Sequence, residues 1–522
     1  MTLFDNKALG ETVHYDGSLE AGGGGDPIVT ELIISSYSEP GLLASLRRFE
    51  ARMDKALGIE SHAIDRKTAD QKRPVKWHEE LTMAFVWASG TLNISCFSIG
   101  FLGWEFGLSL KQSLLIIIFA CFTGGAVSAY CATFGAAMGL RQISVSRYSF
   151  GWYPNKLNAF LNGIEQLGWT AVSCISGGLA LTAVADGHIS LVIGVVIIAT
   201  VSLVISFLGL GYILVYERYA WVLNLAIFLI IFAMVGPYAD NTTPSSVKGA
   251  DLSGNLLSLF SLIYGGSSSW CTIVSDFYVH YPADVSRLKI FVLTILGLAV
   301  PTSIGMSAGA MVASALNTQP SWEAAYTNPH EGLGFLIRDM LHPPVFAKIV
   351  LVLFSCTGIN ANVMILYSGA ISFQQMARPL AKIPRFIWTI MCFAVVVVLA
   401  VAGRQKLNIY LQNFLTLLGY WCTNYFVILM LEHTLFRKRD FNNYDLDGWN
   451  DPSRLPIGIG ASVVFLLGVV AWCMGMVESW FVGPLGGLIG EFGGDVANEL
   501  TFVVTFIAYM PARYLELKYF GR

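Results

Sequence analysis

The stretch Tyr264-Gly265-Gly266-Ser267-Ser268-Ser269-Trp270 interrupts a long apolar run of the chain. An earlier apolar run carries a similar interruption, Ser89-Gly90-Thr91, followed by Asn93 and Ser95. Glycine tolerates an unwound backbone, and the amide and carbonyl groups that unwinding frees in a membrane must face a cavity or a ligand. The other interpretation is close helix packing through small residues. We favour two broken helices that form a site, because the interruptions recur five apolar runs apart.

The composition is that of a membrane protein. Of the 522 residues, 55% are hydrophobic and only 13% are charged, against roughly 25% in an ordinary soluble domain. A helix that crosses the bilayer core needs about 20 apolar residues. Such runs lie near 81–104, 111–138, 157–184, 188–209, 216–236, 255–276, 288–315, 344–372, 384–403, 409–434, 455–476 and 496–512. The sequence therefore predicts an all-α integral membrane protein with twelve transmembrane helices, arranged as a five-plus-five inverted repeat with two additional helices.

These runs divide the chain into three parts. Residues 1–80 are predicted to form a partly disordered cytoplasmic region, 81–512 the transmembrane domain and 513–522 a cytoplasmic tail. A short helix is predicted over 43–57, with apolar residues on one side and basic residues around the rest. Two placements of this helix stay open: on the inner leaflet, or solvated or docked on the protein.

The basic residues predict the orientation of the bundle. With both termini cytoplasmic, most of the 32 Lys and Arg residues fall on the inner side, as the positive-inside rule requires. The exceptions are Lys111, Lys248, Arg338, Lys348, Arg404 and Lys406. Asn241-Thr242-Thr243 then lies in an external loop, where it is a potential glycosylation acceptor.

Charge, cysteine and histidine usage exclude several classes of protein. A formal net charge of −3 argues against a nucleic-acid partner, which needs a basic face. The nine cysteines lie in apolar runs without a Cys-x-x-Cys pair, and they are expected to be small buried residues with free thiols. The eight histidines have no ligand spacing. We expect no metal, no cofactor and no catalytic constellation, so the chain is not expected to be an enzyme.

The third apolar run carries a polar and aromatic face. Glu165, Trp169 and Ser173 are spaced i, i+4, i+8 and therefore stack along one side of a helix. A carboxyl group at this depth costs about 2.5–3.5 kcal/mol on insertion scales, so it is expected to face the interior of the bundle. Glu165 is a candidate to bind an N–H of a ligand or to carry a coupling proton. The alternative is a structural carboxyl group paired with a neighbouring helix.

Further candidates come from the eighth run and from the two interruptions. Asn360 and Asn362 offer amides that can both donate to and accept from the edge of a heterocycle. Thr357 is a candidate sodium ligand, although a single hydroxyl is a weak signal. Trp169 and Trp270 suggest a flat aromatic ligand stacked between two rings. Ser89, Asn93 and Gly266 complete the candidate binding site.

Several longer motifs match a known family. They are Trp87-Ala88-Ser89, Arg147-Tyr148-Ser149-Phe150-Gly151-Trp152, Leu167-Gly168-Trp169, Ser275-Asp276-Phe277-Tyr278, Gly419-Tyr420-Trp421, Gly490-Glu491-Phe492-Gly493-Gly494-Asp495-Val496 and Arg513-Tyr514-Leu515-Glu516-Leu517. With these motifs, from about Leu46 to Arg522, the chain resembles the fungal purine–cytosine permeases, a branch of the nucleobase–cation symporters that adopt the leucine-transporter fold.

The resemblance implies uptake of cytosine and purine bases across the plasma membrane by alternating access, usually together with a proton. It also implies that Ser89, Trp169, Trp270 and Asn362 contact the substrate. A proton is accordingly expected as the coupling ion in preference to sodium.

The chain departs from the family pattern at the inferred site. Asn360-Ala361-Asn362-Val363-Met364 stands where Ala-Asn-Asn-Ile-Pro is typical, Ser173 and Thr91 stand where Asn is common, and Glu165 stands where an apolar or small residue is usual. Another flat heterocycle such as pyridoxine, which the vitamin B6 transporters of the same branch carry, therefore stays an alternative substrate. A nutrient receptor that binds without transporting is a third reading.

Overall fold

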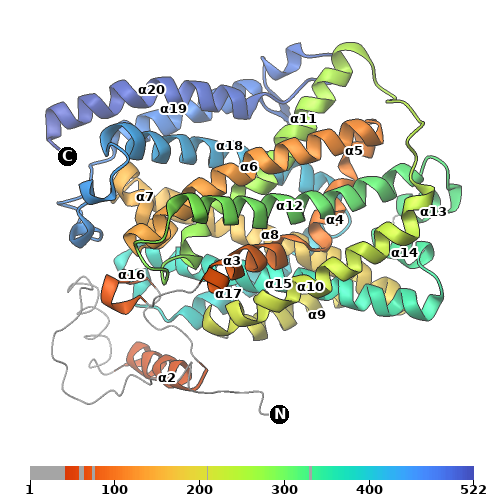
Figure 1. Cartoon of the computed structure of the whole chain (residues 1–522), viewed down its shortest axis with the longest axis horizontal. Coiled ribbons are helices and arrows are strands. Elements are labelled where there is room, and N and C mark those ends of the chain that lie inside the picture. The colour runs from red at the N-terminus through yellow and green to blue at the C-terminus, as the bar shows by residue number, and fades with distance from the viewer. Residues whose placement is uncertain (1–40, 58–63, 73–76, 208–209, 329–331) are drawn as a thin grey trace.

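The structure is a computed structural model that describes residues 41–57, 64–72, 77–207, 210–328 and 332–522. Long helices lie side by side in one bundle (Figure 1). The main helices are α3 (Trp77–Thr91), α4 (Ile94–Gly100), α6 (Leu110–Met138), α8 (Asn155–Val184), α9 (Leu191–Ser206), α10 (Leu210–Val235), α11 (Gly249–Ser268), α12 (Arg287–Ala315), α15 (Pro344–Met376), α17 (Arg385–Gly403), α18 (Leu407–Leu431), α19 (Ile459–Gly475) and α20 (Ala497–Phe520). The shorter elements are α2 (Leu42–Leu57), α5 (Leu102–Glu105), α7 (Gln142–Phe150), α13 (Pro320–Thr327), α14 (Gly332–Met340), α16 (Arg378–Ala381) and the hairpin of β1 (Val477–Glu478) and β2 (Phe481–Val482).

Length and composition confirm a multi-pass membrane protein. Among the described residues, eight helices are long and apolar enough to cross a membrane, or nine if the bent pair at the start of the bundle forms one span. Two shorter apolar helices, α9 and α19, add to these, and α11 occupies the remaining predicted run. Every predicted run therefore corresponds to a helix, while the count of twelve crossings stays a prediction.

Two boundaries differ from those expected from the sequence. The run expected at 216–236 begins six residues earlier, at Leu210, and Glu217 is buried inside this helix. The run expected at 496–512 continues as α20 to Phe520, because Arg513 and Glu516 are buried against neighbouring groups. Most of the predicted tail, 513–522, is therefore part of the last helix.

The packing of the helices follows an inverted repeat. In the first half, α6 packs against α11, which opens the second half. In the second half, α12 packs against α3 and α4, which open the first. The middle helices of the two halves, α8 and α15, also pack on each other. Each half thus supports the broken helix of the other half, and α19 and α20 pack together beside α18.

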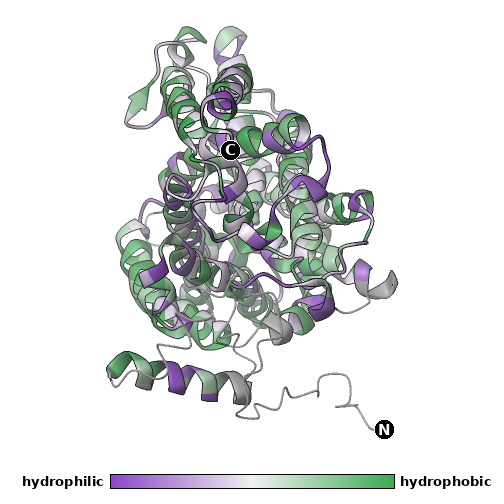
Figure 2. Cartoon of the chain, turned by 90° about the vertical axis from the view of Figure 1, so that its left-hand side faces the viewer, coloured by the Kyte–Doolittle hydropathy of each residue, from purple (hydrophilic) through white to green (hydrophobic). Residues whose placement is uncertain are grey.

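Helix α2 is docked on the bundle. Arg47 forms an ion pair with Glu50 at 2.6 Å and donates from Nε to the Lys382 carbonyl oxygen at 2.8 Å. The amide of Arg385 donates to Glu50 Oε1 at 2.6 Å. Of the two placements left open by the sequence, the structure shows the docked one, with α2 lying beside the end of the bundle at which α20 ends (Figures 1 and 2).

The nine cysteines are all free thiols. Cys356 and Cys473 are partly exposed, and the other seven are buried. The expectation of small buried residues is therefore confirmed for seven of the nine and is wrong for Cys356 and Cys473.

Candidate functional site

The first span is broken at Leu92 and Asn93. The segments Glu80–Thr91 and Ile94–Glu105 meet at an angle of 62°. Asn93 caps the second segment, because its Oδ1 accepts from the amides of Ser95 at 2.8 Å and Cys96 at 3.1 Å. Its Nδ2 donates to the Gly90 carbonyl oxygen at 2.8 Å. The amide that the sequence suggested as a substrate contact is thus engaged in holding the break.

The second break follows Ser268, where α11 gives way to two turns of 3₁₀ helix, Ser269–Thr272 and Val274–Phe277. The Ser128 hydroxyl on α6 bridges the carbonyl oxygens of Ser267 and Ser268 at 3.1 and 3.2 Å. Side chains of a neighbouring helix therefore satisfy carbonyl groups that a continuous helix would have used.

Two indole rings flank this second break. Trp169 Nε1 donates to Ser269 Oγ at 3.2 Å, and the ring lies edge-to-face with Phe414 at 6.0 Å. Trp270 lies edge-to-face with Trp87 of the first span at 5.5 Å. Trp169 and Trp270 stay partly exposed although most of their neighbours are buried. Both rings therefore offer free surface between the broken helices.

Gly265 and Gly266 have different roles. A Cβ atom at Gly265 would lie 2.0 Å from the Leu415 carbonyl oxygen, so this glycine permits close contact of α11 with α18. A Cβ atom at Gly266 would lie 3.7 Å from the nearest atom of the Trp169 ring. Gly266 thus borders the indole surface, as expected for a residue of the site.

Glu165 is buried and faces the second break. Its Oε2 accepts from Thr272 Oγ1 at 3.2 Å. Among the described residues, no Lys, Arg or His lies within ion-pair distance of this carboxyl group. The partner on the neighbouring element is thus a neutral hydroxyl group, which leaves the charge of an ionised Glu165 uncompensated.

Hydroxyl groups of α8 and α15 meet the start of α4. Ser173 and Ser95 share a hydrogen bond of 3.0 Å between their hydroxyl groups. Thr357 Oγ1 accepts from the amide of Ile94 at 3.0 Å and donates to the Phe354 carbonyl oxygen at 2.6 Å. The hydroxyl suggested as a sodium ligand is therefore engaged by the first free amide of α4.

The two amides of α15 point to different neighbours. Asn360 Oδ1 accepts from the Tyr216 hydroxyl on α10 at 2.7 Å. Asn362 Nδ2 donates to Ser202 Oγ on α9 at 3.1 Å, and its Oδ1 has no hydrogen-bond partner among the described residues. Asn360 thus lies at the contact with α10, whereas Asn362 is directed towards α9.

A second buried carboxyl group, missed in the sequence, lies on α10. Glu217 is fully buried, and neither oxygen has a hydrogen-bond partner among the described residues. The Ser89 side chain lies near the Glu217 carboxyl group, but the two do not form a hydrogen bond. One face of α10 thus meets the first break, because Asn224 Nδ2 donates to the Ser89 carbonyl oxygen at 3.0 Å. The available signal was an acidic residue inside the run predicted at 216–236, to which no role was assigned.

A cavity of about 430 Å³ opens at the opposite end of the bundle from α2. It lies between α11, α18 and the β1–β2 hairpin, and its lining includes Glu105, Leu262, Thr416 and Glu478. Leu262 is three residues before Gly265. The cavity therefore reaches the helix that carries the second break.

Two broken helices that face each other in a bundle with an inverted repeat are the architecture typical of secondary transporters. The comparisons with known proteins identify the family. Residues 70–492 match the family model described as permease for cytosine/purines, uracil, thiamine and allantoin. The chain therefore belongs to this permease family and is a transporter, not an enzyme.

Several characterised proteins are similar over nearly their whole length. The purine-cytosine permease FCY21 of Saccharomyces cerevisiae is 34% identical over 94% of this chain and 92% of its own. The vitamin B6 transporter TPN1 of the same organism is 30% identical over 93% of both chains. A solved structure of Mhp1, a nucleobase-cation-symport-1 family transporter with bromovinylhydantoin bound in a closed conformation, matches with a TM-score of 0.60 at 16% identity. That match covers 88% of this chain and 96% of Mhp1 and supports the leucine-transporter fold.

Proposed function

We propose that the chain imports nucleobases, cytosine or purines, across the plasma membrane by proton symport, with both termini in the cytoplasm. The observation that carries this proposal is the partly exposed pair of indoles, Trp169 and Trp270, beside the second break. Planar bases stack on such rings, and every base has the π-face that stacking needs. The similarity to purine-cytosine permeases at 33–34% identity supports the same substrate class.

Import of another flat heterocycle, such as pyridoxine, is the second candidate. Its support is the vitamin B6 transporter TPN1, which matches this chain over the same length at 30% identity. The departures at Ser173 and at Asn360-Ala361-Asn362 lie on helices that contact the first break. An altered polar edge there would change which ring edge the site recognises.

Competition for uptake tests these candidates. Cells that lack their own nucleobase and pyridoxine carriers would express the chain and take up radiolabelled cytosine, with unlabelled adenine, hypoxanthine and pyridoxine as competitors. Nucleobase transport predicts inhibition by cytosine or purines and none by pyridoxine, whereas labelled pyridoxine uptake without cytosine uptake would establish the alternative. A non-transporting receptor would bind ligand without accumulating it in proteoliposomes.

A buried carboxyl group supports a proton as the coupling ion. An ionised carboxyl group in an apolar interior is costly unless a cation lies beside it. Glu165 lies beside Thr272 of the second break, so a proton taken up there would change the contact with the broken helix. The Thr357 hydroxyl, the suggested sodium ligand, already accepts a hydrogen bond from the amide of Ile94.

Glu165→Gln tests the proton role. The amide keeps the shape of the side chain and cannot ionise, so we expect uptake that loses most of its dependence on external pH. Glu217→Gln is the matched variant at the other buried carboxyl group. If only Glu217→Gln flattens the pH profile, the coupling proton belongs to Glu217; if neither variant does, proton coupling through these groups is wrong.

A further inference from the structure

A second cavity lies at the end of the bundle where α20 ends. Its volume is about 270 Å³, below the ~300 Å³ at which pockets for drug-sized ligands begin. The charged side chains of its lining are those of four arginines, Arg437, Arg454, Arg513 and Arg522, and of one acidic residue, Glu432. A small group that accepts hydrogen bonds therefore fits this cavity better than a cation does.

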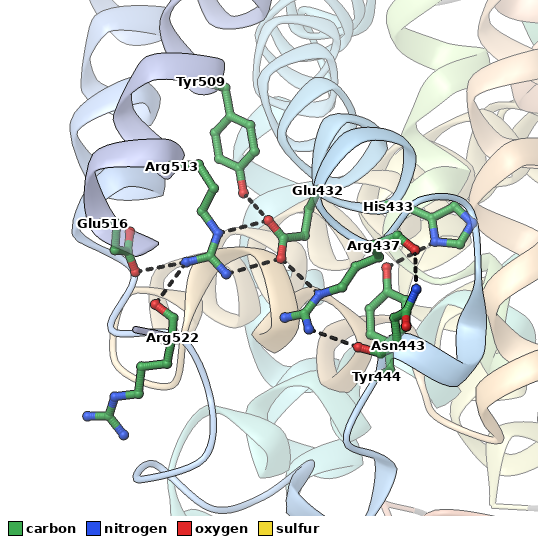
Figure 3. A network of polar contacts seen from close by, with 9 residues as sticks. All are labelled: Glu432, His433, Arg437, Asn443, Tyr444, Tyr509, Arg513, Glu516 and Arg522. Carbon is green, nitrogen blue, oxygen red and sulfur yellow. Dashed lines mark hydrogen bonds and ion pairs between the residues drawn. The ribbon is translucent and has the colours of Figure 1, made fainter. Parts of the chain in front are cut away.

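The single carboxylate of the lining is already saturated (Figure 3). Glu432 is fully buried. Its Oε1 accepts from Arg437 Nε and from Arg513, both at 3.1 Å, and its Oε2 accepts from Arg513 Nε at 2.9 Å and from the Tyr509 hydroxyl at 3.0 Å. Glu432 thus has little capacity left to neutralise further guanidinium groups.

Three of the guanidinium groups keep donors free. Arg454 binds Asp445 through Nε and one terminal nitrogen, and 47% of its side chain is exposed. Arg437 uses Nε and one terminal nitrogen, the latter on the Asn443 carbonyl oxygen at 2.9 Å. Arg522 donates only to backbone carbonyl groups, and no carboxylate of the described residues lies within ion-pair distance of its side chain. These forked donors match the oxygens of a phosphate group.

The surroundings of the cavity place it at a membrane surface. Tyr514, Tyr519 and Phe520, in the last turns of α20, are 62%, 74% and 50% exposed. Exposed aromatic side chains at the end of a transmembrane helix are typical of the layer of lipid head groups. Leu517 and Gly521 of the same turns line the cavity. An anionic group and an apolar chain can therefore be accommodated side by side.

We propose that this cavity binds the phosphate group of an anionic phospholipid, held by Arg437, Arg454 and Arg522. With the orientation proposed above, the cavity faces the cytoplasmic leaflet, which carries the anionic lipids. The bound phosphate would join the end of α18, the connection that carries Arg454 and the last turn of α20. The site is distinct from the substrate site, because the lining of the cavity contains no residue of either break and lies where α20 ends (Figure 1).

The test measures lipid binding to the purified full chain in a neutral detergent. The probes are phosphatidylinositol, phosphatidylserine, phosphatidylcholine and inorganic phosphate, and the readouts are bound lipids counted by native mass spectrometry and the thermal unfolding midpoint. The variants are Arg454→Gln and Arg522→Gln. Lys289→Gln is the control, because Lys289 is 48% exposed and ion-paired with Glu80, as Arg454 is with Asp445, but does not line the cavity.

We expect phosphatidylinositol or phosphatidylserine to bind the unaltered chain and Lys289→Gln equally and to raise the unfolding midpoint. Each arginine variant should bind roughly tenfold or more weakly, because a charge-assisted hydrogen bond contributes about 1.5–3 kcal/mol. Equal binding by the arginine variants, or equal binding of phosphatidylcholine, would overturn the proposal. Stabilisation by inorganic phosphate to the same degree would assign the site to a free anion and overturn the lipid assignment.

A substrate arm separates this inference from the transport function. Cytosine and pyridoxine would be added to the same preparations. A substrate-induced rise of the midpoint that persists in Arg454→Gln and Arg522→Gln shows that the variants are folded and that the lipid site alone is lost.

Discussion

Glu165 and Glu217 are the two buried carboxyl groups to which the proposed proton coupling would fall. Both carboxyl groups are buried in helices of the transporter, and both lie next to a break: Glu165 at Thr272 of the second and Glu217 at Ser89 of the first. A carboxyl group at the centre of a bilayer costs about 2.5–3.5 kcal/mol on insertion scales. No ion pair within the described residues offsets this cost for either carboxyl group. The position of the two groups therefore indicates a role in function more than in stability.

Truncating either indole should abolish high-affinity binding. Stacking of a base on an aromatic side chain contributes about 1–3 kcal/mol, so Trp169→Ala and Trp270→Ala should each weaken substrate binding by roughly 5- to 150-fold. The measurement is equilibrium binding to purified protein. Trp480→Ala is the control, because this tryptophan is 64% exposed in the β1–β2 hairpin. Full-affinity binding by either site variant would exclude a stacked substrate.

Glu478, in the hairpin outside the spanning helices, should make stability depend on pH. Burial raises the pKa of Glu478 to about 8, a hydrogen bond from Thr416 opposes this shift, and the neighbouring Asp495 adds to it. The folded chain therefore holds a proton between the ordinary value of 4.5 and about 8 that the unfolded chain has lost, so stability falls as the pH rises through this window.

Glu478→Gln should remove this fall in stability at rising pH, because an amide stays neutral at every pH. The unfolding midpoint of the variant, measured from pH 5 to pH 8, should fall less than that of the unaltered chain. Parallel curves for the two proteins would contradict the assignment.

In the two broken helices, the approximate position of each break could be predicted from the sequence, but the roles of the residues at the break could not. Gly90 and Gly266 marked the neighbourhood of both breaks, but the expected reason was wrong: both glycines are helical, and the breaks lie at Leu92 and Asn93 and after Ser268. The structural role of Asn93 was not predictable from the sequence. An amide side chain can contact a ligand or cap a helix, and only the three-dimensional structure shows that its oxygen meets the amides of Ser95 and Cys96.

Adjacent glycines of α11 should respond differently to alanine. Gly265→Ala would place a methyl group 2.0 Å from the Leu415 carbonyl oxygen, so α11 and α18 would have to separate and folded protein should be lost. Gly266→Ala meets only the Trp169 ring, at 3.7 Å, so the chain should fold with altered substrate affinity. Surface expression and binding, measured in parallel, check both outcomes; normal expression of Gly265→Ala would show that the contact is not required.

At the scale of the whole molecule, hydropathy and spacing predicted most of the architecture. Twelve apolar runs and two breaks five runs apart led to the inverted repeat that the packing of α6 on α11 and of α12 on α3 supports. The errors lie where polar residues are buried inside helices. Glu217 was assigned no role, and Arg513 was placed in a tail, because a sequence does not show that Arg513 forms an ion pair with Glu432 of a neighbouring element.

The orientation of the bundle can be measured with a pair of introduced cysteines. Thr242 and Asn442 are both exposed, at opposite ends of the bundle. With cytoplasmic termini, a membrane-impermeant maleimide applied to intact cells should label Thr242→Cys at once and Asn442→Cys only after the cells are permeabilised. The reverse pattern would invert the proposed topology and move the arginine cavity to the outer leaflet.

The burial of the native sulfur atoms makes such measurements simple. Seven of them are buried in the core, whereas Cys356 and Cys473 are partly exposed and Cys473 lies in the last turn of α19. Replacement of these two residues by serine should therefore give a silent background for chemical labelling. Any reactivity that emerges at Cys271, next to Trp270, would report the moment at which the second break opens to water.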